Sequence, residues 1–153
     1  MFPPRLPNVH TCTTVARALG ADQTINYKSC PDWGRRVLEL TDGRGADHVV
    51  ELGGPGTLAR SIEAVRLGGL IALIGVHTGW GGYVPTVDLM AKQARLRGII
   101  VGSRAHQTDM IRAIEAIGLR PIIDRRFALA QLADAFRYQA RGDHFGKIGI
   151  TIE

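Results

Sequence analysis

The stretch DHVVELGGPGTLARSIEAVRLGGLIALIG, residues 47–75, decides the fold. It opens with the β-branched run 47–52, which predicts a strand, and continues through a glycine-rich turn into a segment with helical spacing. It ends in the apolar run 70–74, whose lack of alternation indicates a parallel strand covered on both faces, at the centre of a sheet. The helical segment is defined by Leu58, Ile62 and Val65, and Gly68-Gly69 is expected to end it.

The same alternation of short strands and longer helices continues on both sides of this stretch. Further strands are predicted at 24–27, 95–101 and 147–152, with an extended piece at 121–124. Four further helices are expected. The first begins after the N-cap Asp32 and carries Trp33, Val37 and Leu40, and the second spans 87–93. The third carries Met110, Ile114 and Ile117, and the fourth carries Leu132, Ala135 and Phe136. This order predicts an α/β fold, a parallel sheet with helices on both faces.

The composition favours one globular domain without a membrane span. The chain has 153 residues, of which 45% are hydrophobic, and this is enough apolar material for a core. No apolar run approaches the roughly 20 residues that cross a bilayer. Three prolines in the first seven residues argue against a leader, so residues 1–10 are interpreted as an irregular tail and the expected location is cytoplasmic.

Several functional classes are disfavoured by the charge and by the metal-binding residue types. The net charge of +5 is spread along the chain and only 6% of residues are aromatic, which is not typical of nucleic-acid binding. The five histidines lack ligand spacing, so no metal is expected in this chain. Cys12 and Cys30 form no Cys-x-x-Cys pair and are interpreted as reduced thiols.

Three successive predicted strands finish in glycine, at Gly53-Gly54, Gly75 and Gly102. Glycine lets a ligand approach the backbone at the carboxyl ends of parallel strands, where open α/β sheets bind their ligands. The alternative interpretation, that these glycines only form tight turns, is equally compatible with the residues alone.

Other chemical motifs are weak. The dinucleotide fingerprint Gly-x-Gly-x-x-Gly, a phosphate loop and a nucleophile elbow are all missing from the sequence. Ser103 is interpreted as a helix cap or a cofactor contact rather than a nucleophile. Glu51 could be a base, although a carboxylate that closes a strand more often makes a structural hydrogen bond or a ribose contact. Arg125-Arg126 could grip an anion or lie on a solvated surface.

A series of short segments occurs along the chain in a characteristic order. They are ALGAD…INY (18–27), TDGRGAD (41–47), VVELGG (49–54), LGG…LIG (67–75), LRGIIVGSR (96–104), PIID (121–124) and HFGKI (144–148). In this order they resemble the medium-chain dehydrogenase/reductase family, in its zinc-type alcohol dehydrogenase and quinone oxidoreductase branch, and the resemblance covers nearly everything after Thr14. It implies a partial Rossmann-like sheet that is the C-terminal part of a coenzyme-binding domain.

The resemblance also implies a binding site for NADP or NAD. Tyr27 would flank the adenosine phosphate of NADP, and Leu52, Gly53 and Gly54 would line the ribose side. Ile74, Gly75 and Val76 would run beside the nicotinamide ribose, and Ile99 and Val101 would offer backbone groups to the carboxamide. Gly102, Ser103 and Arg104 would follow just beyond.

The same resemblance predicts how the chain is divided and what it lacks. Residues 11–120 would form the partial dinucleotide-binding domain, and residues 121–153 would be a segment that packs on a catalytic domain in relatives. That domain and the glycine-rich pyrophosphate loop are expected to lie outside this chain. Self-association is therefore expected, through 121–152 and through 96–101, a strand that pairs across a dimer in relatives.

Three functional hypotheses follow. The first is an NAD(P)-dependent oxidoreductase that transfers hydride to or from an alcohol, aldehyde, enone or quinone, with little activity expected from this chain alone. The second is a non-catalytic remnant that folds, self-associates and binds nucleotide weakly, because helix-terminus amides that hold pyrophosphate are missing. The third, a nucleic-acid-binding module, has only the net charge in its favour.

Overall fold

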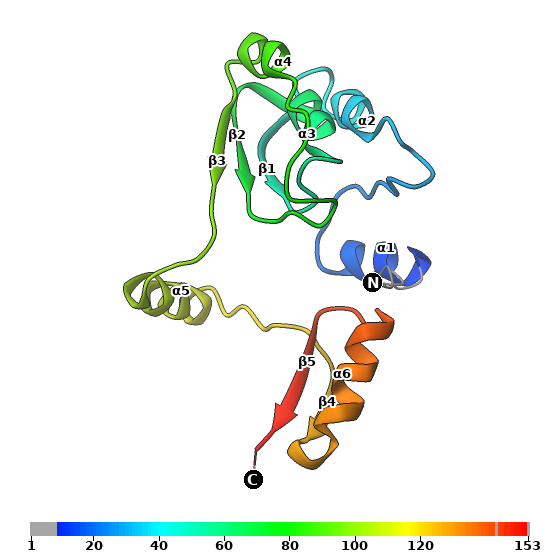
Figure 1. The fold of residues 1–153 in the computed structure, drawn as a ribbon, viewed down its shortest axis with the longest axis vertical. Coiled ribbons are helices and arrows are strands. Elements are labelled where there is room, and N and C mark those ends of the chain that lie inside the picture. Colours follow the sequence, from blue (N-terminus) through cyan, green and yellow to red (C-terminus); the bar gives the residue numbers. More distant parts are fainter. Residues whose placement is uncertain (1–8, 143, 153) are drawn as a thin grey trace. The chain divides into compact units, whose positions relative to one another are not determined.

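The computed structural model describes residues 9–142 and 144–152, and the chain divides into two compact units. One unit comprises residues 25–101, and the other comprises residues 1–24 together with 102–153. Figure 1 shows the elements of both units in chain order, and each unit is described by itself.

The unit 25–101 is built on a three-stranded parallel sheet. Its strands are β1 (Ala46–Glu51), β2 (Val65–Leu73) and β3 (Arg95–Gly98), in the order β1-β2-β3. The predicted centre of the sheet is therefore confirmed, because β2 pairs with a strand on each side. The helices of this unit are α2 (Trp33–Leu40), α3 (Leu58–Ala64) and α4 (Thr86–Ala91).

The core of this unit lies between α3 and the sheet. Ile62 and Ile71 are completely buried and pack with Leu58 and Val65, the apolar residues expected from the helical and strand patterns. Burying each side chain of this size stabilises the fold by about 1.5–3 kcal/mol. On the opposite face of β1, Val50 is exposed, as the alternation of side chains along a strand requires.

Helix α2 packs against α3 (Figure 1), and a glycine lies at their contact. A Cβ atom on Gly34 would lie 2.7 Å from the carbonyl oxygen of Arg60, so only glycine allows the helices to approach this closely. Asp32 occupies the predicted N-cap position of α2, but its side chain makes no capping hydrogen bond. Its carboxylate instead pairs with the Arg60 guanidinium at 2.5 Å.

The predicted end of α3 at Gly68-Gly69 is wrong. The helix ends at Ala64, and β2 begins at the next residue, so the glycine pair lies within the strand. Gly68 has φ +69° where the β1–β2 register shifts, so the glycines form an irregularity of the strand rather than a helix cap. The Lys92 ammonium group binds the carbonyl oxygens of Glu63 and Val65 at 3.0 Å and thereby caps the end of the helix.

Two strand predictions also need correction. Residues 24–27 form no strand, because Asn26 organises a local turn: its carbonyl accepts from the Ser29 and Cys30 amides, and its side chain accepts from the Lys28 amide. The predicted strand 95–101 is shorter than expected. Strand β2 ends at Leu73, so beyond Gly98 the only ladder-type bond in the described residues runs from the Ile99 amide to the Leu73 carbonyl, at 2.9 Å.

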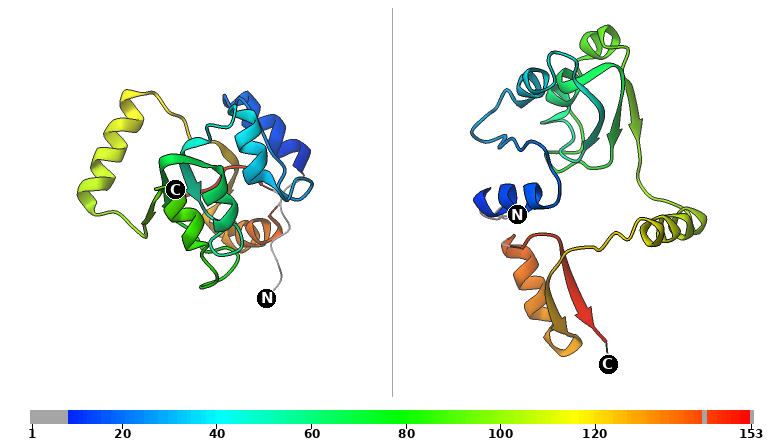
Figure 2. Two further views of the ribbon diagram at one scale, coloured as in Figure 1. Left: turned by 90° about the horizontal axis from the view of Figure 1, so that it is seen from above. Right: turned by 180° about the vertical axis from the view of Figure 1, so that it is seen from behind.

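The second unit contains a strand–helix–strand motif (Figures 1 and 2). Strand β4 (Ile123–Ala128) leads through the 3₁₀ turn Leu129–Gln131 into α6 (Leu132–Arg141), and β5 (Lys147–Thr151) returns parallel to β4. The predicted helix around Ala135 and the last strand are confirmed. The unit also contains α1 (Val9–Ala18) and α5 (Arg104–Ala116). Helix α1 begins two residues before the expected start at Thr11, and residues 1–8 of the predicted tail lie outside the described residues.

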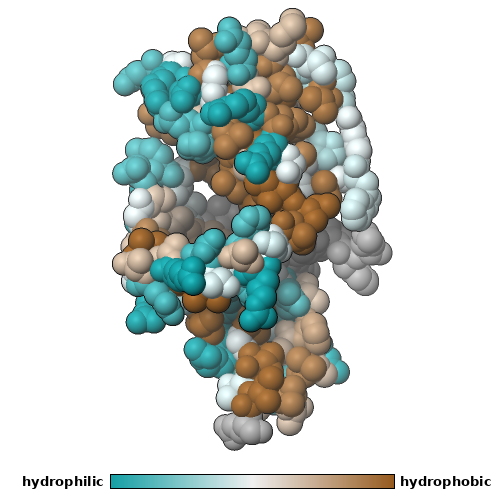
Figure 3. Space-filling model, turned by 90° about the vertical axis from the view of Figure 1, so that its left-hand side faces the viewer, coloured by the Kyte–Doolittle hydropathy of each residue, from teal (hydrophilic) through white to brown (hydrophobic). Residues whose placement is uncertain are grey.

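Many apolar side chains reach the surface, as the brown areas of Figure 3 show. Many of them lie at the ends of β1 and β2, beyond β3, and on α4, α5 and α6, and Trp80 and Tyr83 lie in the segment between β2 and α4. None of the helices in the described part of the chain is long and apolar enough to cross a membrane. Cys12 and Cys30 are free thiols.

Candidate functional site

The carboxyl ends of β1 and β2 are joined by a short ladder of backbone hydrogen bonds. The Ile74 amide donates to the Glu51 carbonyl at 2.9 Å, and the His77 amide donates to the Leu52 carbonyl at 3.3 Å. The Thr78 amide and hydroxyl both donate to the Gly53 carbonyl at 2.8 Å. The residues after both strands therefore form one continuous rim, here called the strand-end rim (52–54 and 74–78).

Glu51 fixes the first half of this rim from inside. Its side chain is 3% exposed, and its Oε1 atom accepts from the Gly53 amide at 2.6 Å, the Gly54 amide at 3.0 Å and the Thr57 hydroxyl at 2.6 Å. Its Oε2 atom accepts from the Ser61 hydroxyl. The structural interpretation of Glu51 is thus confirmed. Thr57 and Ser61 are not among the residues predicted from the sequence, although their spacing at the start of α3 is visible there.

The glycines of the rim are explained by packing within the chain. A Cβ atom on Gly75 would lie 3.0 Å from two Leu52 backbone atoms, and closer still to the Leu52 carbonyl oxygen. Gly54 has φ +82°, and its Cβ would lie 2.9 Å from the Val76 Cα atom. The close approach of one strand end to the other therefore requires these glycines. This favours the alternative interpretation, in which the glycines serve the tight local geometry of the chain and not the approach of a ligand.

An apolar surface remains at the rim. Four side chains that follow the ends of the three strands are half-exposed and constitute what is here called the strand-end patch: Leu52 (54%), Ile74 (43%), Val76 (41%) and Ile99 (43%). The ladder described above holds the backbones of Leu52 and Ile74, and the Ile99 amide is bound to the Leu73 carbonyl, so most of the patch is presented on a hydrogen-bonded base. Exposed apolar groups gathered at one place are typical of ligand and partner sites.

The remaining predicted site residues lie in different surroundings. Tyr27 is half-exposed in the turn that Asn26 organises, and Val101 is exposed beyond β3. Gly102, Ser103 and Arg104 belong to the other unit. There, Ser103 is the N-cap of α5: its hydroxyl accepts from the His106 amide at 3.3 Å, and the His106 ring accepts from the Ser103 amide. The helix-cap interpretation of Ser103 is confirmed.

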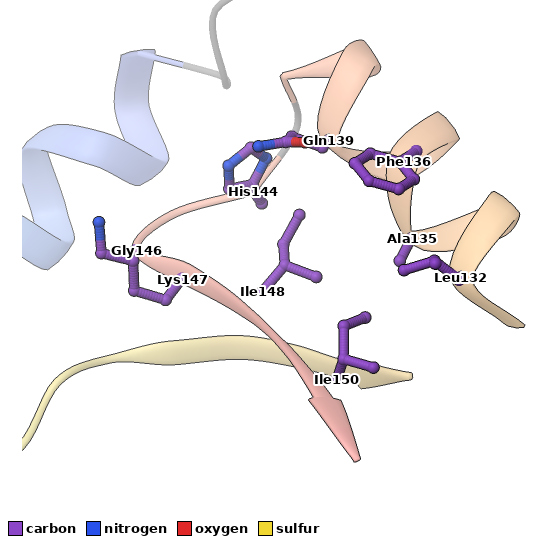
Figure 4. A pocket seen from close by; sticks show the side chains of 9 residues that line it. All are labelled: Leu132, Ala135, Phe136, Gln139, His144, Gly146, Lys147, Ile148 and Ile150. Carbon is purple, nitrogen blue, oxygen red and sulfur yellow. The ribbon is translucent and has the colours of Figure 1, made fainter. Parts of the chain in front are cut away.

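A second feature, which sequence analysis did not predict, is a hollow of about 330 Å³ between α6 and β5. Figure 4 shows side chains of α6 facing Ile148 and Ile150 of β5 across it. The α6 side chains that line it are Leu132, Ala135, Phe136 and Gln139. His144 stands at its end, with a buried Nδ1 atom for which the described residues provide no hydrogen-bond partner. The lining is mainly apolar and forms the inner face of the strand–helix–strand motif.

The other face of α6 carries a cluster of charge and aromatic rings. The Tyr138 hydroxyl and the Phe145 amide hold the pKa of the Asp124 carboxyl below its usual range, because both donate to it, at 2.7 and 3.2 Å. The Arg125 guanidinium lies 4.6 Å from the centre of the Tyr138 ring. Arg125 is therefore engaged with aromatic rings rather than arranged with Arg126 as an anion clamp.

A metal site is not apparent within the described part of the chain. None of its residues gather into a group of three or more His, Cys, Asp or Glu side chains that could hold an ion. Among the described carboxyls, the pKa of Asp47 on β1 is shifted most strongly. Hydrogen bonds from Arg44 and Arg66 lower its pKa from 3.8 to about 2, so it serves as an ion-pair partner at the surface.

Comparison with known proteins identifies the family to which these features correspond. Residues 12–117 match the family model described as zinc-binding dehydrogenase. A zinc-type alcohol dehydrogenase-like protein of Schizosaccharomyces pombe is 38% identical over 143 residues, which cover 90% of this chain and 41% of that protein. The chain thus spans about two-fifths of the length of this relative.

Solved structures give the same result for the fold. A Sinorhizobium meliloti protein described as an alcohol dehydrogenase superposes with a TM-score of 0.82 at 39% identity, over 91% of this chain and 40% of its own. An NAD-dependent alcohol dehydrogenase superposes with a TM-score of 0.81 at 31% identity, over 94% of this chain and 42% of its own. The predicted partial Rossmann-like fold and the predicted family are confirmed.

Proposed function

Because the chain belongs to the zinc-binding dehydrogenase family, we propose that it is the coenzyme-binding part of an NAD(P)-dependent oxidoreductase. The dinucleotide would lie across the carboxyl ends of β1, β2 and β3. The observation that carries this proposal is the strand-end patch, four half-exposed apolar side chains beyond three adjacent parallel strands. Open parallel sheets bind ligands outside these strand ends, and a bound ring system would cover the patch.

Each half of the rim would have its own part in binding. When bound, the dinucleotide gives or accepts a hydride, and the chain's residues hold it in place. Leu52, Gly53 and Gly54 would lie along one ribose, and the segment 74–76 would lie along the nicotinamide ribose. The Ile99 amide already donates to Leu73, so its carbonyl is the group proposed to accept from the carboxamide.

The choice between NADP and NAD follows from Tyr27 in this proposal. A half-exposed ring beside the adenosine ribose would leave room for the extra phosphate of NADP, which is the cofactor we expect to bind more tightly. Gly102, Ser103 and Arg104 stay a sequence-based prediction. The described residues offer no group that fits a zinc ion, so no catalytic step is assigned to zinc in this chain.

The substrate class is proposed from the family. Alcohols, aldehydes, enones and quinones are the candidates, and the alcohol dehydrogenase names of the relatives support the first. Hydride transfer requires the substrate to be held against the nicotinamide ring. Since more than half of the S. pombe relative lies outside the match, we expect the 153-residue chain to bind cofactor but to turn over poorly on its own.

Titration of the chain with NADPH and NADH, followed by fluorescence, tests the binding proposal. Ile74→Asp places a negative charge under the anionic ligand and is expected to weaken binding at least about tenfold, equivalent to about 1.4 kcal/mol. Val50→Asp, on an exposed position of the same sheet, is the matched control and should leave the affinity unchanged. Absence of saturable binding by the wild type at millimolar cofactor would refute the proposal and favour the non-catalytic remnant. Assays with a quinone and with simple alcohols then test turnover.

We also propose that the chain self-associates, and we keep the cytoplasmic location expected from the sequence as part of the proposal. Strand β3 is at the edge of its sheet, and Ile100 beyond it is almost fully exposed, so a second copy could pair along this edge. The apolar hollow between α6 and β5 gives segment 121–153 a second surface to bury. Analytical ultracentrifugation should detect a dimer; a monomer at high protein concentration would count against pairing.

A further inference from the structure

The carboxylate of Glu51 is the only side chain that reaches both the loop after β1 and the start of α3 through the hydrogen bonds found in the described residues. We infer that Glu51 is a positioning residue for the dinucleotide and that it acts as a hydrogen-bond acceptor whose charge is dispensable. The inference rests on the proposed function, because the loop that Glu51 holds includes Gly53 and Gly54.

The loop is fixed from two sides. Glu51 binds the amides of Gly53 and Gly54, and Thr78 binds the carbonyl of Gly53 and the amide of Gly56. The amides of Gly53 and Gly54 therefore point into the protein and do not face a ligand. What this loop offers to a dinucleotide is the rigid position of its backbone and of the neighbouring Leu52 side chain.

Glu51 is too enclosed to act as a base. The side chain is 3% exposed, and both of its oxygens face donors of the same chain. A substrate would have to displace one of these hydrogen bonds before it could give a proton to the carboxylate. The alternative that Glu51 is a general base is therefore not supported by its surroundings.

The two carboxylate oxygens have unequal requirements. Oε1 accepts from two backbone amides, which can only donate, and from the Thr57 hydroxyl. Among the described residues, Oε2 accepts only from the Ser61 hydroxyl, which can also accept a hydrogen bond. A glutamine could therefore place its carbonyl oxygen at the Oε1 position and donate from its amide nitrogen to Ser61. An aspartate keeps the charge, but its oxygens are one methylene further from the loop.

Three variants of Glu51 separate geometry from charge in titrations of the full chain with NADH and NADPH. The dissociation constant of Glu51→Gln should lie within about threefold of the wild-type value. Glu51→Asp and Glu51→Ala should bind the dinucleotides at least about tenfold more weakly, because buried donors of the loop lose their acceptor. The structural control is Ser61→Ala, a buried change on α3 that removes the Oε2 donor and spares the loop. It should lower the melting temperature and leave the affinity unchanged.

Hydrogen exchange at the Gly53 and Gly54 amides gives a measurement that does not require cofactor. Exchange at these amides should be faster in Glu51→Asp than in Glu51→Gln. Comparison of these two variants therefore tests whether geometry or charge is required, even if Glu51→Ala does not fold. Equal exchange in the two variants overturns the inference, as does loss of affinity in Ser61→Ala equal to that in Glu51→Ala. A wild type that binds neither dinucleotide overturns the proposed function, and the exchange measurement then still decides whether Glu51 orders the loop.

Discussion

Substitution of Gly75 by alanine tests whether the close approach of the strand ends holds the strand-end rim together. The added Cβ would lie 3.0 Å from the Cα and carbonyl carbon of Leu52, and closer still to its carbonyl oxygen. These are backbone atoms, so no side-chain rotation relieves the overlap. The strands must separate, and separation weakens the bonds of the Ile74 and His77 amides.

The magnitude follows from these two effects. Overpacking of this kind costs about 1–3 kcal/mol, and the weakened hydrogen bonds add about 1 kcal/mol. The free energy of unfolding should therefore fall by about 2–4 kcal/mol, which urea denaturation followed by circular dichroism can measure. The matched control is Gly81→Ala, because a Cβ there would have no atom of a described residue within 4 Å. This substitution should change stability by less than about 0.5 kcal/mol. An unchanged urea midpoint for Gly75→Ala would refute the packing explanation of this glycine.

Three further changes probe other parts of the chain. Ile71→Ala removes a fully buried side chain and should cost about 2–5 kcal/mol in a denaturant titration, against about 1 kcal/mol for Ile71→Val. The pKa of the Asp47 carboxyl, measured by NMR, should lie near 2 rather than near 3.8, because Arg44 and Arg66 bind its ionised form. The stability that these ion pairs contribute is complete above pH 3.8 and is lost as the pH falls through 2. Asp47→Asn should therefore flatten the acid side of the profile of unfolding free energy against pH. Ser103→Ala removes the cap of α5 and should cost about 1 kcal/mol of helix stability, measurable as increased exchange in its first turn.

The elements with strong periodicity could be predicted from the sequence. Ile62 belongs to a segment with helical spacing and Ile71 to an apolar strand. The pattern predicts that the two segments bury these side chains against each other, and both lie in the core. Segment 24–27 has similar β-branched character but was wrongly predicted as a strand. The turn around Asn26 satisfies its backbone locally, and strand propensity alone does not reveal that competition.

The site was less predictable for a related reason. The glycines at the strand ends are visible in the sequence, but the atoms that require them, such as the Leu52 carbonyl near Gly75, belong to the segment that follows a neighbouring strand. The donors gathered around Glu51 come from a loop and a helix whose relative position only folding determines. The hollow between α6 and β5 likewise depends on how these two neighbouring elements pack, which their separate sequence patterns do not specify.

The direct passage from α3 into β2 limits how this protein can change in length. Ala64 is the last residue of the helix and Val65 the first of the strand, with no loop between them. A residue inserted here could not bulge into solvent, and if the strand absorbed it, Ile71 would turn from the core to the other face of the sheet. Length variation among relatives should therefore avoid this junction and concentrate in residues 79–85, between the strand-end rim and α4, where added residues disturb no strand register.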